Sequence, residues 1–247
     1  MSMTSLSERE ITRYNRQMMV ADWGEEGQEK LKGATVFIAG MGGLGCPVSI
    51  YLAVAGVGQM RICDVDRIEL SNLNRQIHYT EGDVGQLKAE TAAARLRETN
   101  PEVDVVSFTD FIDADNIGEI AGEADLVVDC LDNFETRYLL NGFCIEKGIP
   151  LVHGAVWGLS GQVAFLHPPE TPCLQCIFPE PSPKAVFPVL GVTPGLTGCL
   201  QAMEALKYLT GVGRNVENRL LMFDGEEMDW RSFKIRRVPN CPACKNL

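Results

Sequence analysis

Positive charge is scarce in this chain of 247 residues. It has 22 Lys and Arg residues against 33 Asp and Glu residues, and its formal net charge is −11. A protein that binds nucleic acid broadly needs a basic face, so this balance argues against that class of function. A small basic pocket inside an acidic shell is still compatible with it.

Long apolar runs are missing as well. No uninterrupted hydrophobic stretch is long enough to cross a bilayer. Residues 1–17 carry charges where a secretory signal would have its apolar region, so we expect no export signal. In such a chain, nine cysteines predict thiols or metal ligands rather than disulfides. We therefore expect a soluble, cytoplasmic protein that does not contact membranes.

What the chain does have, through its first 150 residues, is an alternation of apolar and amphipathic segments. Buried strands are predicted at 34–40, 58–66, 102–109 and 124–132, and helices at 44–55, 86–101 and 134–148. This alternation is typical of a mostly parallel sheet that is covered on both faces. An earlier helix should begin after Ser7, because Ser7 and Glu10 have the spacing of a capping box.

The pattern changes after Pro150. Residues 150–168 predict two antiparallel strands around a Gly-Leu-Ser-Gly turn. Prolines then recur between residues 179 and 194, which predicts a long loop. A helix at 195–211 and a terminal strand pair within 219–237 complete the order. The predicted fold class is α/β, with a mostly parallel sheet, antiparallel C-terminal strands and helices on both faces.

Glycines gather between the first predicted strand and the helix after it. The pattern G-x-G-x-x-G with one additional glycine comprises Gly40, Gly42, Gly43 and Gly45. Such glycines allow a tight turn and let backbone N–H groups approach a phosphate at the positive end of the helix. Asp64 or Asp66, at the end of the next strand, could bind ribose hydroxyls. The alternatives are a purely structural glycine turn and the dinucleotide site of a dehydrogenase.

The residues that follow the second strand help to decide between these alternatives. They are Asn72, Arg75, Gln76 and Lys88. A hydride-transfer site needs a pocket for the nicotinamide rather than a group of cations. A triphosphate that is being cleaved does need cations, which neutralise the charge that builds on the leaving pyrophosphate. Single Arg and Lys residues are most often solvated surface residues, so it is their arrangement that favours a nucleotide-cleaving site.

These segments, taken in order, resemble one family. The segments are RYNRQ with Arg16, GMGGLG, DVD, SNLNRQ, VGQLK with Lys88, DCLDNFETR with Asp132, and GCLQAMEALK. From about residue 7 to its C-terminus the chain resembles the ubiquitin-activating-enzyme-like adenylyltransferases of the MoeB, ThiF and HesA group. The resemblance implies a single, Rossmann-like adenylation domain. Its parts would be an N-terminal helical arm (1–33), a nucleotide-binding half (34–150) and a carrier-binding and zinc half (151–247).

The resemblance also implies roles for the polar residues. Asp64, with Asp66 beside it, would hold the ATP ribose. Asn72, Arg75 and Lys88 would contact the phosphates, and Gln76 would also belong to the ATP-binding site. Asp132 would bind Mg²⁺, although it could instead cap the helix that begins near Phe134. Arg16 would reach, as an arginine finger, into the site of a second subunit of a homodimer.

The implied reaction is ATP-dependent adenylation of the C-terminal glycine carboxylate of a small ubiquitin-like sulfur carrier protein. Pyrophosphate would leave, and a sulfur donor such as a cysteine desulfurase would later convert the acyl-adenylate to a thiocarboxylate, in molybdopterin, thiamine or related biosynthesis. The carrier tail, ending in Gly-Gly, would lie beneath the proline-rich loop. Three competing functions are an NAD-dependent dehydrogenase, a non-catalytic binding module for a small protein, and a tRNA-modifying relative, which the acidic balance disfavours.

Four of the cysteines form two C-x-x-C pairs, Cys173 with Cys176 and Cys241 with Cys244. Each pair can present two thiolates to one tetrahedral Zn²⁺, and two pairs fill a closed structural site. More than 60 residues separate the pairs, so the ligands must meet across the fold. A redox-active pair is the alternative, but the resemblance also indicates zinc.

The remaining cysteines are predicted to be packed, because all of them fall inside predicted strands or helices: Cys46, Cys63, Cys130, Cys144 and Cys199. The histidines His78, His153 and His167 show no ligand spacing. Residues 177–198 contain no cysteine, and Phe187 stands about where some relatives carry a reactive thiol. Since burial makes a thiol inert, we expect no thioester on this chain.

Overall fold

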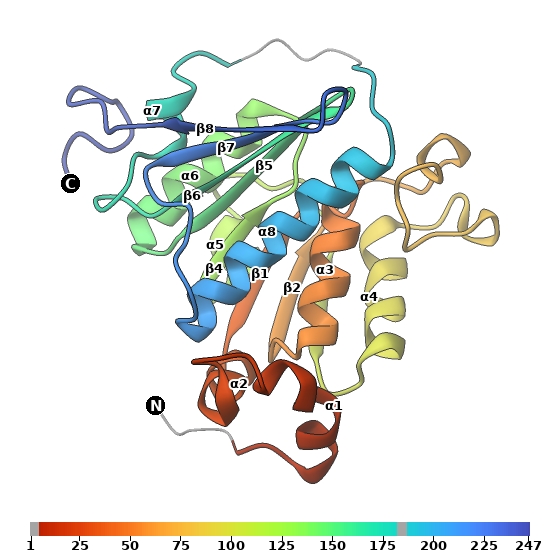
Figure 1. The fold of residues 1–247 in the computed structure, drawn as a ribbon. Helices are drawn as coiled ribbons and strands as arrows, with labels where there is room; N and C mark the ends of the chain where they lie inside the picture. The colour runs from red at the N-terminus through yellow and green to blue at the C-terminus, as the bar shows by residue number, and fades with distance from the viewer. Residues whose placement is uncertain (1–4, 182–186) are drawn as a thin grey trace.

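The computed structural model describes residues 5–181 and 187–247 and is built around one eight-stranded sheet (Figure 1). The spatial order of the strands is β3-β2-β1-β4-β5-β6-β7-β8. The strands are β1 (Thr35–Ala39), β2 (Gln59–Cys63), β3 (Asp104–Phe108), β4 (Leu126–Asp129), β5 (Leu151–Trp157), β6 (Ser160–Leu166), β7 (Arg219–Asp224) and β8 (Asp229–Lys234). Strands β1 to β5 pair in parallel, whereas β6, β7 and β8 are added antiparallel.

Helices cover both faces of this sheet (Figure 1). They are α1 (Glu8–Met18), α2 (Gly24–Lys32), α3 (Gly45–Ala55), α4 (Lys88–Thr99), α5 (Ile117–Ala121), α6 (Phe134–Lys147), α7 (Leu174–Ile177) and α8 (Val192–Thr210). Helices α3, α4 and α8 lie on one face and α5 and α6 on the other, while α1 and α2 sit below the sheet. Among the described residues, none of the helices combines the length and apolar character that a membrane crossing requires.

Strand β1 shows how the sequence produces this layering. Val36 and Ile38 are fully buried in the core beneath α3 and α8, and Phe37 and Ala39 are fully buried in the core on the α6 side. Successive strand residues point to opposite faces, so a strand covered on both faces must be apolar throughout. The predicted α/β class, with antiparallel strands at the C-terminal end of the sheet, is confirmed.

The boundaries of several elements differ from the prediction. Strand β4 ends at Asp129, so residues 130–133 form a loop and Cys130 lies just outside the strand. Helix α8 begins at Val192 rather than at residue 195, because Pro194 falls in its first turn, where a missing N–H costs nothing. The predicted proline-rich loop is therefore shorter, and its residues 182–186 lie outside the described chain.

The N-terminal helix begins as predicted. Ser7 is the N-cap of α1, and its hydroxyl accepts a hydrogen bond from the Glu10 N–H. The Glu10 carboxylate accepts one from the Ser7 N–H in return, which completes the capping box. Helix α2 lies within the predicted helical arm (1–33) but was not predicted as a separate helix. Its N-cap is Trp23, which makes no side-chain capping hydrogen bond, so the sequence carries no start signal there.

Candidate functional site

The glycine loop (residues 40–45) joins β1 to α3 at the carboxyl edge of the parallel strands. Gly40 has φ +96°, and a Cβ atom there would lie 2.7 Å from the carbonyl oxygen of Cys130. A Cβ atom on Gly45 would lie 1.9 Å from the carbonyl oxygen of Gly40. Both positions therefore require glycine. Helix α3 has neither a side-chain N-cap nor an acidic residue in its first turn, so its N-terminus suits an anion.

Asp64 closes this loop from the side of β2. Its Oδ2 atom accepts a hydrogen bond of 2.7 Å from the Met41 N–H, and its Oδ1 atom accepts one of 2.9 Å from the Asp66 N–H. Burial raises the pKa of Asp64 above its usual value, although Lys88 opposes the rise. The aspartate predicted to hold a ribose thus also shapes the glycine loop, and each of its oxygens has further capacity to accept a hydroxyl hydrogen bond.

Lys88, the first residue of α4, reaches back toward the end of β2. Its Nζ atom lies 2.8 Å from Oδ2 of Asp66, and the lysine side chain is 7% exposed while that of the aspartate is 66% exposed. A buried ammonium group requires a counter-ion, and Asp66 supplies it. A phosphate brought to this position would share the cation with Asp66.

The SNLNRQ segment forms a tight turn that begins with a 3₁₀ helix at Leu70–Asn72. The buried side chain of Asn72 accepts a hydrogen bond of 3.2 Å from the Glu69 N–H. The backbone carbonyl oxygen of Asn72 accepts from the N–H groups of both Arg75 and Gln76 at 3.0 Å. Asn72 therefore holds the turn that presents the next two predicted site residues.

Arg75 and Gln76 lie beside the glycine loop. A Cβ atom on Gly43 would lie 3.5 Å from Cγ of Arg75, and one on Gly42 would lie 3.5 Å from Nε2 of Gln76. Gln76 is only 4% exposed, and its Oε1 atom is buried without a hydrogen-bond partner among the described residues. The structure thus brings these two side chains to the glycine loop, with one acceptor left for a further donor.

Asp132 lies exposed in the loop between β4 and α6. This loop adjoins the glycine loop, since a Cβ atom on Gly40 would be 3.5 Å from the Leu131 nitrogen. The N-cap of α6 is Asn133, whose side chain accepts a hydrogen bond of 2.9 Å from the Thr136 N–H. Capping does not account for Asp132, because the neighbouring residue performs it.

Arg16 lies far from these residues within its own chain. Helix α1 packs on the C-terminal ends of α3 and α4, where Gln17 donates to the Ala55 carbonyl at 2.7 Å and Arg13 donates to the Thr99 carbonyl at 3.3 Å. The glycine loop is at the other end of α3, whose 11 residues span about 16 Å. Figure 1 shows α1 below the sheet, away from the carboxyl edge of the parallel strands.

The two C-x-x-C pairs meet across the fold, as predicted. The Sγ atoms of Cys173, Cys176, Cys241 and Cys244 all lie within 4.8 Å of one another. Cys173 and Cys241 are separated by 3.6 Å, and Cys176 and Cys244 by 3.5 Å. Four sulfurs about 2.3 Å from one zinc ion would lie about 3.8 Å apart, so the cluster fits a tetrahedral zinc site.

Three buried side chains next to the Asp132 loop were not predicted as functional. They are Asp129, Arg137 and His153: the arginine and the histidine both contact Asp129, beneath the loop that carries Asp132. Asp129 and Arg137 belong to the DCLDNFETR segment, where a carboxylate and a cation flank Asp132. His153 stands alone in the sequence, and its pairing depends on the neighbouring positions of β4 and β5.

The chain is similar in sequence to several known proteins. Over 249 residues the chain is 45% identical to the sulfur carrier protein adenylyltransferase of Thermus thermophilus, and the match covers 96% of this chain and 92% of that protein. It is 43% identical to the SAMP-activating enzyme E1 of Haloferax volcanii, with 97% and 91% covered. It also matches 57% of the adenylyltransferase and sulfurtransferase MOCS3 of Culex quinquefasciatus, at 41% identity over 98% of this chain.

A solved structure shares the fold. The crystal structure of E. coli MccB with ATP has a TM-score of 0.82 and 25% identity, over 94% of this chain and 73% of that one. The sequence itself matches the ThiF family from residue 14 to residue 243, which is nearly its whole length. With close relatives matched over more than nine-tenths of both chains, this chain belongs to the ThiF family.

Proposed function

We propose that this chain catalyses the ATP-dependent adenylation of the C-terminal glycine carboxylate of a small ubiquitin-like sulfur carrier protein, with release of pyrophosphate. The chain is an adenylyltransferase, as its relatives are named. The observation that carries the proposal is the set of backbone, amide and cationic side-chain groups around the glycine loop, which would suit phosphates. Arg75 and Gln76 border that loop, and Lys88 is held beside Asp66 at the end of the neighbouring strand.

The phosphates of ATP would lie at the N-terminus of α3. There the glycine loop offers backbone N–H groups, and Arg75 and Lys88 would neutralise the charge that develops on the pyrophosphate. The free Oε1 atom of Gln76 is available for a hydroxyl or amide donor. Asp64, already fixed by the Met41 N–H, would accept from the ribose hydroxyls.

Asp132 would hold Mg²⁺. Its carboxylate is exposed, close to the glycine loop and not used as a helix cap. Carboxylate oxygens are ligands that Mg²⁺ prefers. When bound, the ion would screen the repulsion between the attacking carboxylate of the carrier and the α-phosphate. Arg75 and Lys88 would also screen this repulsion.

The carrier tail would approach beneath the segment that precedes α8. Gly158, in the turn between β5 and β6, donates to the Pro188 carbonyl at 2.8 Å and accepts from the Leu190 N–H at 3.3 Å. At the far end of this segment, a Cβ atom on Gly191 would lie 2.2 Å from the Asn74 carbonyl oxygen. The segment therefore runs from the β5–β6 turn to the SNLNRQ turn, across the edge where the phosphates would bind.

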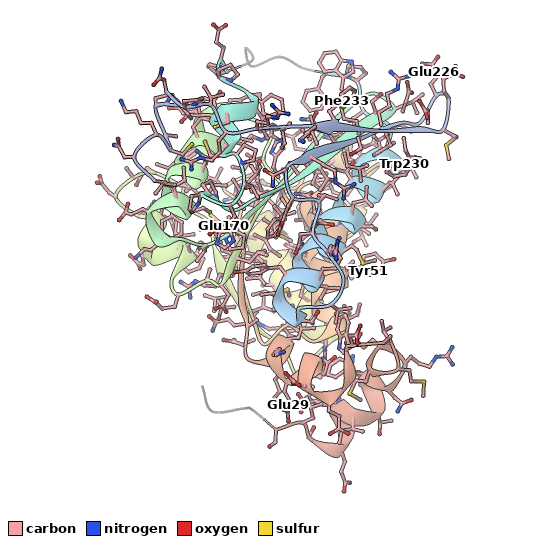
Figure 2. All side chains as sticks on the ribbon, turned by 60° about the vertical axis from the view of Figure 1, so that its left-hand side comes forward. Glu29, Tyr51, Glu170, Glu226, Trp230 and Phe233 are labelled. Carbon is pink, nitrogen blue, oxygen red and sulfur yellow. The ribbon has the colours of Figure 1, made fainter. Side chains whose placement is uncertain are left out.

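A second copy of the chain would complete the site with Arg16. Exposed apolar side chains occur after the end of α1, on α3 and on α8, and α3 packs against α8. They are Met19, Val20, Tyr51, Val54, Leu196 and Met203, and Figure 2 shows Tyr51 at the surface beside α8. Covering these side chains in a homodimer would bring α1 of one subunit against the other.

After adenylation, a sulfur donor such as a cysteine desulfurase would convert the acyl-adenylate to a thiocarboxylate, in molybdopterin, thiamine or a related biosynthesis in the cytoplasm. The four-cysteine cluster would hold a structural Zn²⁺. It has four protein ligands and hence no open position for a substrate.

The test is ATP–pyrophosphate exchange in the presence of each small Gly-Gly-ended protein of the source organism. We expect exchange with one of these proteins and none with the same protein truncated by its last glycine. A parallel assay would follow the reduction of NAD. Absence of exchange with every candidate carrier would contradict the proposal.

A further inference from the structure

A buried ionic cluster lies beneath the loop that carries Asp132. Asp129 and His153 are fully buried, and Arg137 is 5% exposed. Oδ2 of Asp129 is 3.2 Å from Nε of Arg137 and 2.7 Å from Nδ1 of His153. The three residues come from β4, α6 and β5, so the cluster joins three elements below the candidate site.

The charges of this cluster balance. Burial alone would raise the pKa of Asp129, but Arg137 and then His153 hold it below its usual value. Burial lowers the pKa of His153, so its imidazole is neutral. Because a carboxylate only accepts hydrogen bonds, Nδ1–H of His153 donates to Asp129. One cation and one anion remain, and a buried pair of this kind avoids the large penalty of an unpaired charge.

The Arg137–Asp129 pair also holds the peptide backbone just before Asp132. Nη2 of Arg137 donates to the Leu131 carbonyl, and Oδ1 of Asp129 accepts from the Leu131 N–H at 3.0 Å. Both backbone polar groups of Leu131 are thereby engaged. On the other side of Asp132, Asn133 is fixed as the cap of α6. Asp132 thus projects from a loop in which both of its neighbours, Leu131 and Asn133, are fixed by hydrogen bonds.

Arg137 itself points inward and not toward the proposed phosphates. Its Nη2 atom also donates to the Gly154 carbonyl at 3.0 Å, and its guanidinium lies over the Phe134 ring, 5.4 Å from the centroid. A guanidinium so enclosed and already paired with Asp129 does not serve as a phosphate ligand. Its contacts instead connect the Asp132 loop to the middle of β5.

We propose that Arg137 is a positioning residue for the metal-binding carboxylate of Asp132. By holding Leu131, it sets the direction in which Asp132 projects and keeps the carboxylate available to Mg²⁺ without contacting the substrate. This inference rests on the proposed function of Asp132. It predicts that releasing Leu131 from Arg137 raises the Mg²⁺ concentration needed for activity more than it raises the KM for the carrier.

The experiment compares Arg137→Lys with His153→Gln in the full-length protein. The lysine keeps the charge beside Asp129 but cannot donate in several fixed directions. His153→Gln alters the same cluster but leaves the contacts to Leu131. Two quantities are measured: amide hydrogen exchange in residues 130–134, and the Mg²⁺ concentration that gives half-maximal ATP–pyrophosphate exchange.

For Arg137→Lys we expect hydrogen exchange at the Leu131 amide, whose N–H donates to Asp129, to be faster by about tenfold. We also expect the half-saturating Mg²⁺ concentration to rise by about tenfold, with the KM for the carrier unchanged. His153→Gln should leave both quantities within about twofold of wild type. If Arg137→Lys does not fold, the neutral pair Asp129→Asn with Arg137→Gln serves in its place, because it strands no buried charge.

Unchanged hydrogen exchange in residues 130–134 of the Arg137 variant would overturn the inference. So would equal effects of the two substitutions, since the cluster would then act only on general stability. Failure of the proposed function has a different signature. If Asp132→Ala kept full activity, the metal role of Asp132 would fall, while hydrogen exchange would still report whether Arg137 holds the loop.

Discussion

Nζ of Lys88 lies 2.8 Å from Oδ2 of Asp66, with the lysine buried and the aspartate largely exposed. The asymmetry means that Lys88 has little freedom to leave its position, whereas Asp66 could turn into solvent if a phosphate were brought to Lys88. Lys88 is therefore held in place before ATP binds. Preorganised charges of this kind contribute most to stabilising a transition state.

We predict that Lys88→Gln lowers ATP–pyrophosphate exchange by about 100-fold or more. The fold should survive, because the exposed carboxylate of Asp66 can be hydrated once its partner is gone. Arg95→Gln is the matched control: Arg95 is a cation on the same helix that pairs with Asp83 and Glu98, and its loss should leave the exchange rate nearly unchanged. If both variants lost exchange activity equally, the loss would follow from removing any positive charge from α4, and a specific role of Lys88 would be excluded.

Asp132 and Asn133 should separate chemistry from stability. Asp132→Ala should abolish adenylation and leave the thermal unfolding midpoint close to that of wild type, because Asp132 does not cap α6. Asn133→Ala removes the cap and should cost about 1 kcal/mol of stability. Exchange assays and thermal unfolding of both variants provide the check. Full activity of Asp132→Ala would rule out its role at the metal.

Arg16 should act across subunits. Arg16→Ala alone should be inactive, because each site would lose the arginine that the other subunit supplies. The arginine cannot act within its own chain, since α1 is remote from the glycine loop there. When Arg16→Ala and Asp132→Ala subunits are mixed and allowed to exchange, half of the dimers are hybrids with one complete site. Activity should then return to about a quarter of the wild-type value. No recovery, in a mixture shown to contain hybrid dimers, would place the arginine outside the partner's site.

Zinc should be present at about one ion per chain. Strong chelation should lower the unfolding temperature and expose the C-terminal tail to proteolysis, because structural metal binding contributes folding free energy. Cys173→Ser should reproduce both effects, whereas Cys199→Ser, outside the cluster, should not. Elemental analysis without zinc, together with free alkylation of Cys173 and Cys241 in the folded protein, would disprove the assignment.

No covalent thioester to the carrier is expected on this chain. Burial raises the pKa of the Cys46 and Cys63 thiols to about 12 and raises those of Cys130 and Cys144 well above their usual value. These thiols stay protonated and unreactive at pH 8. Cys199 was predicted to be packed but is only half-buried, so outside the four-cysteine cluster iodoacetamide should label it first.

Serine or alanine in place of each of these five cysteines should leave pyrophosphate exchange and carrier thiocarboxylation largely unchanged. Mass spectrometry of the reaction, quenched with and without hydroxylamine, would detect an adduct. A hydroxylamine-sensitive enzyme–carrier species that disappears in any one variant would identify a nucleophilic cysteine and refute this prediction.

The sequence predicted what depends on local chemistry. Gly40 and Gly45 mark a turn that no other residue permits. The two C-x-x-C pairs predict one shared metal site, which requires the four cysteines to meet across the fold. It did not predict what depends on packing. The pairing of His153 with Asp129 requires β4 and β5 to be neighbours. The partial exposure of Cys199 depends on how α8 packs on the sheet. The start of α8 was missed because Pro194, taken as a break, occupies a position where a helix accepts it.

The cysteine cluster also has a topological consequence. A metal ion that joins Cys176 to Cys241 closes a ring of chain that contains α8, β7 and β8. Joining residues as far apart as Cys173 and Cys241, 68 positions along the chain, lowers the entropy of the unfolded state by an amount worth on the order of 4 kcal/mol. While the ring is closed, β7 and β8 cannot leave the sheet as a free tail. The antiparallel half of the sheet should therefore unfold as one cooperative unit with the metal and fray from the β8 edge without it.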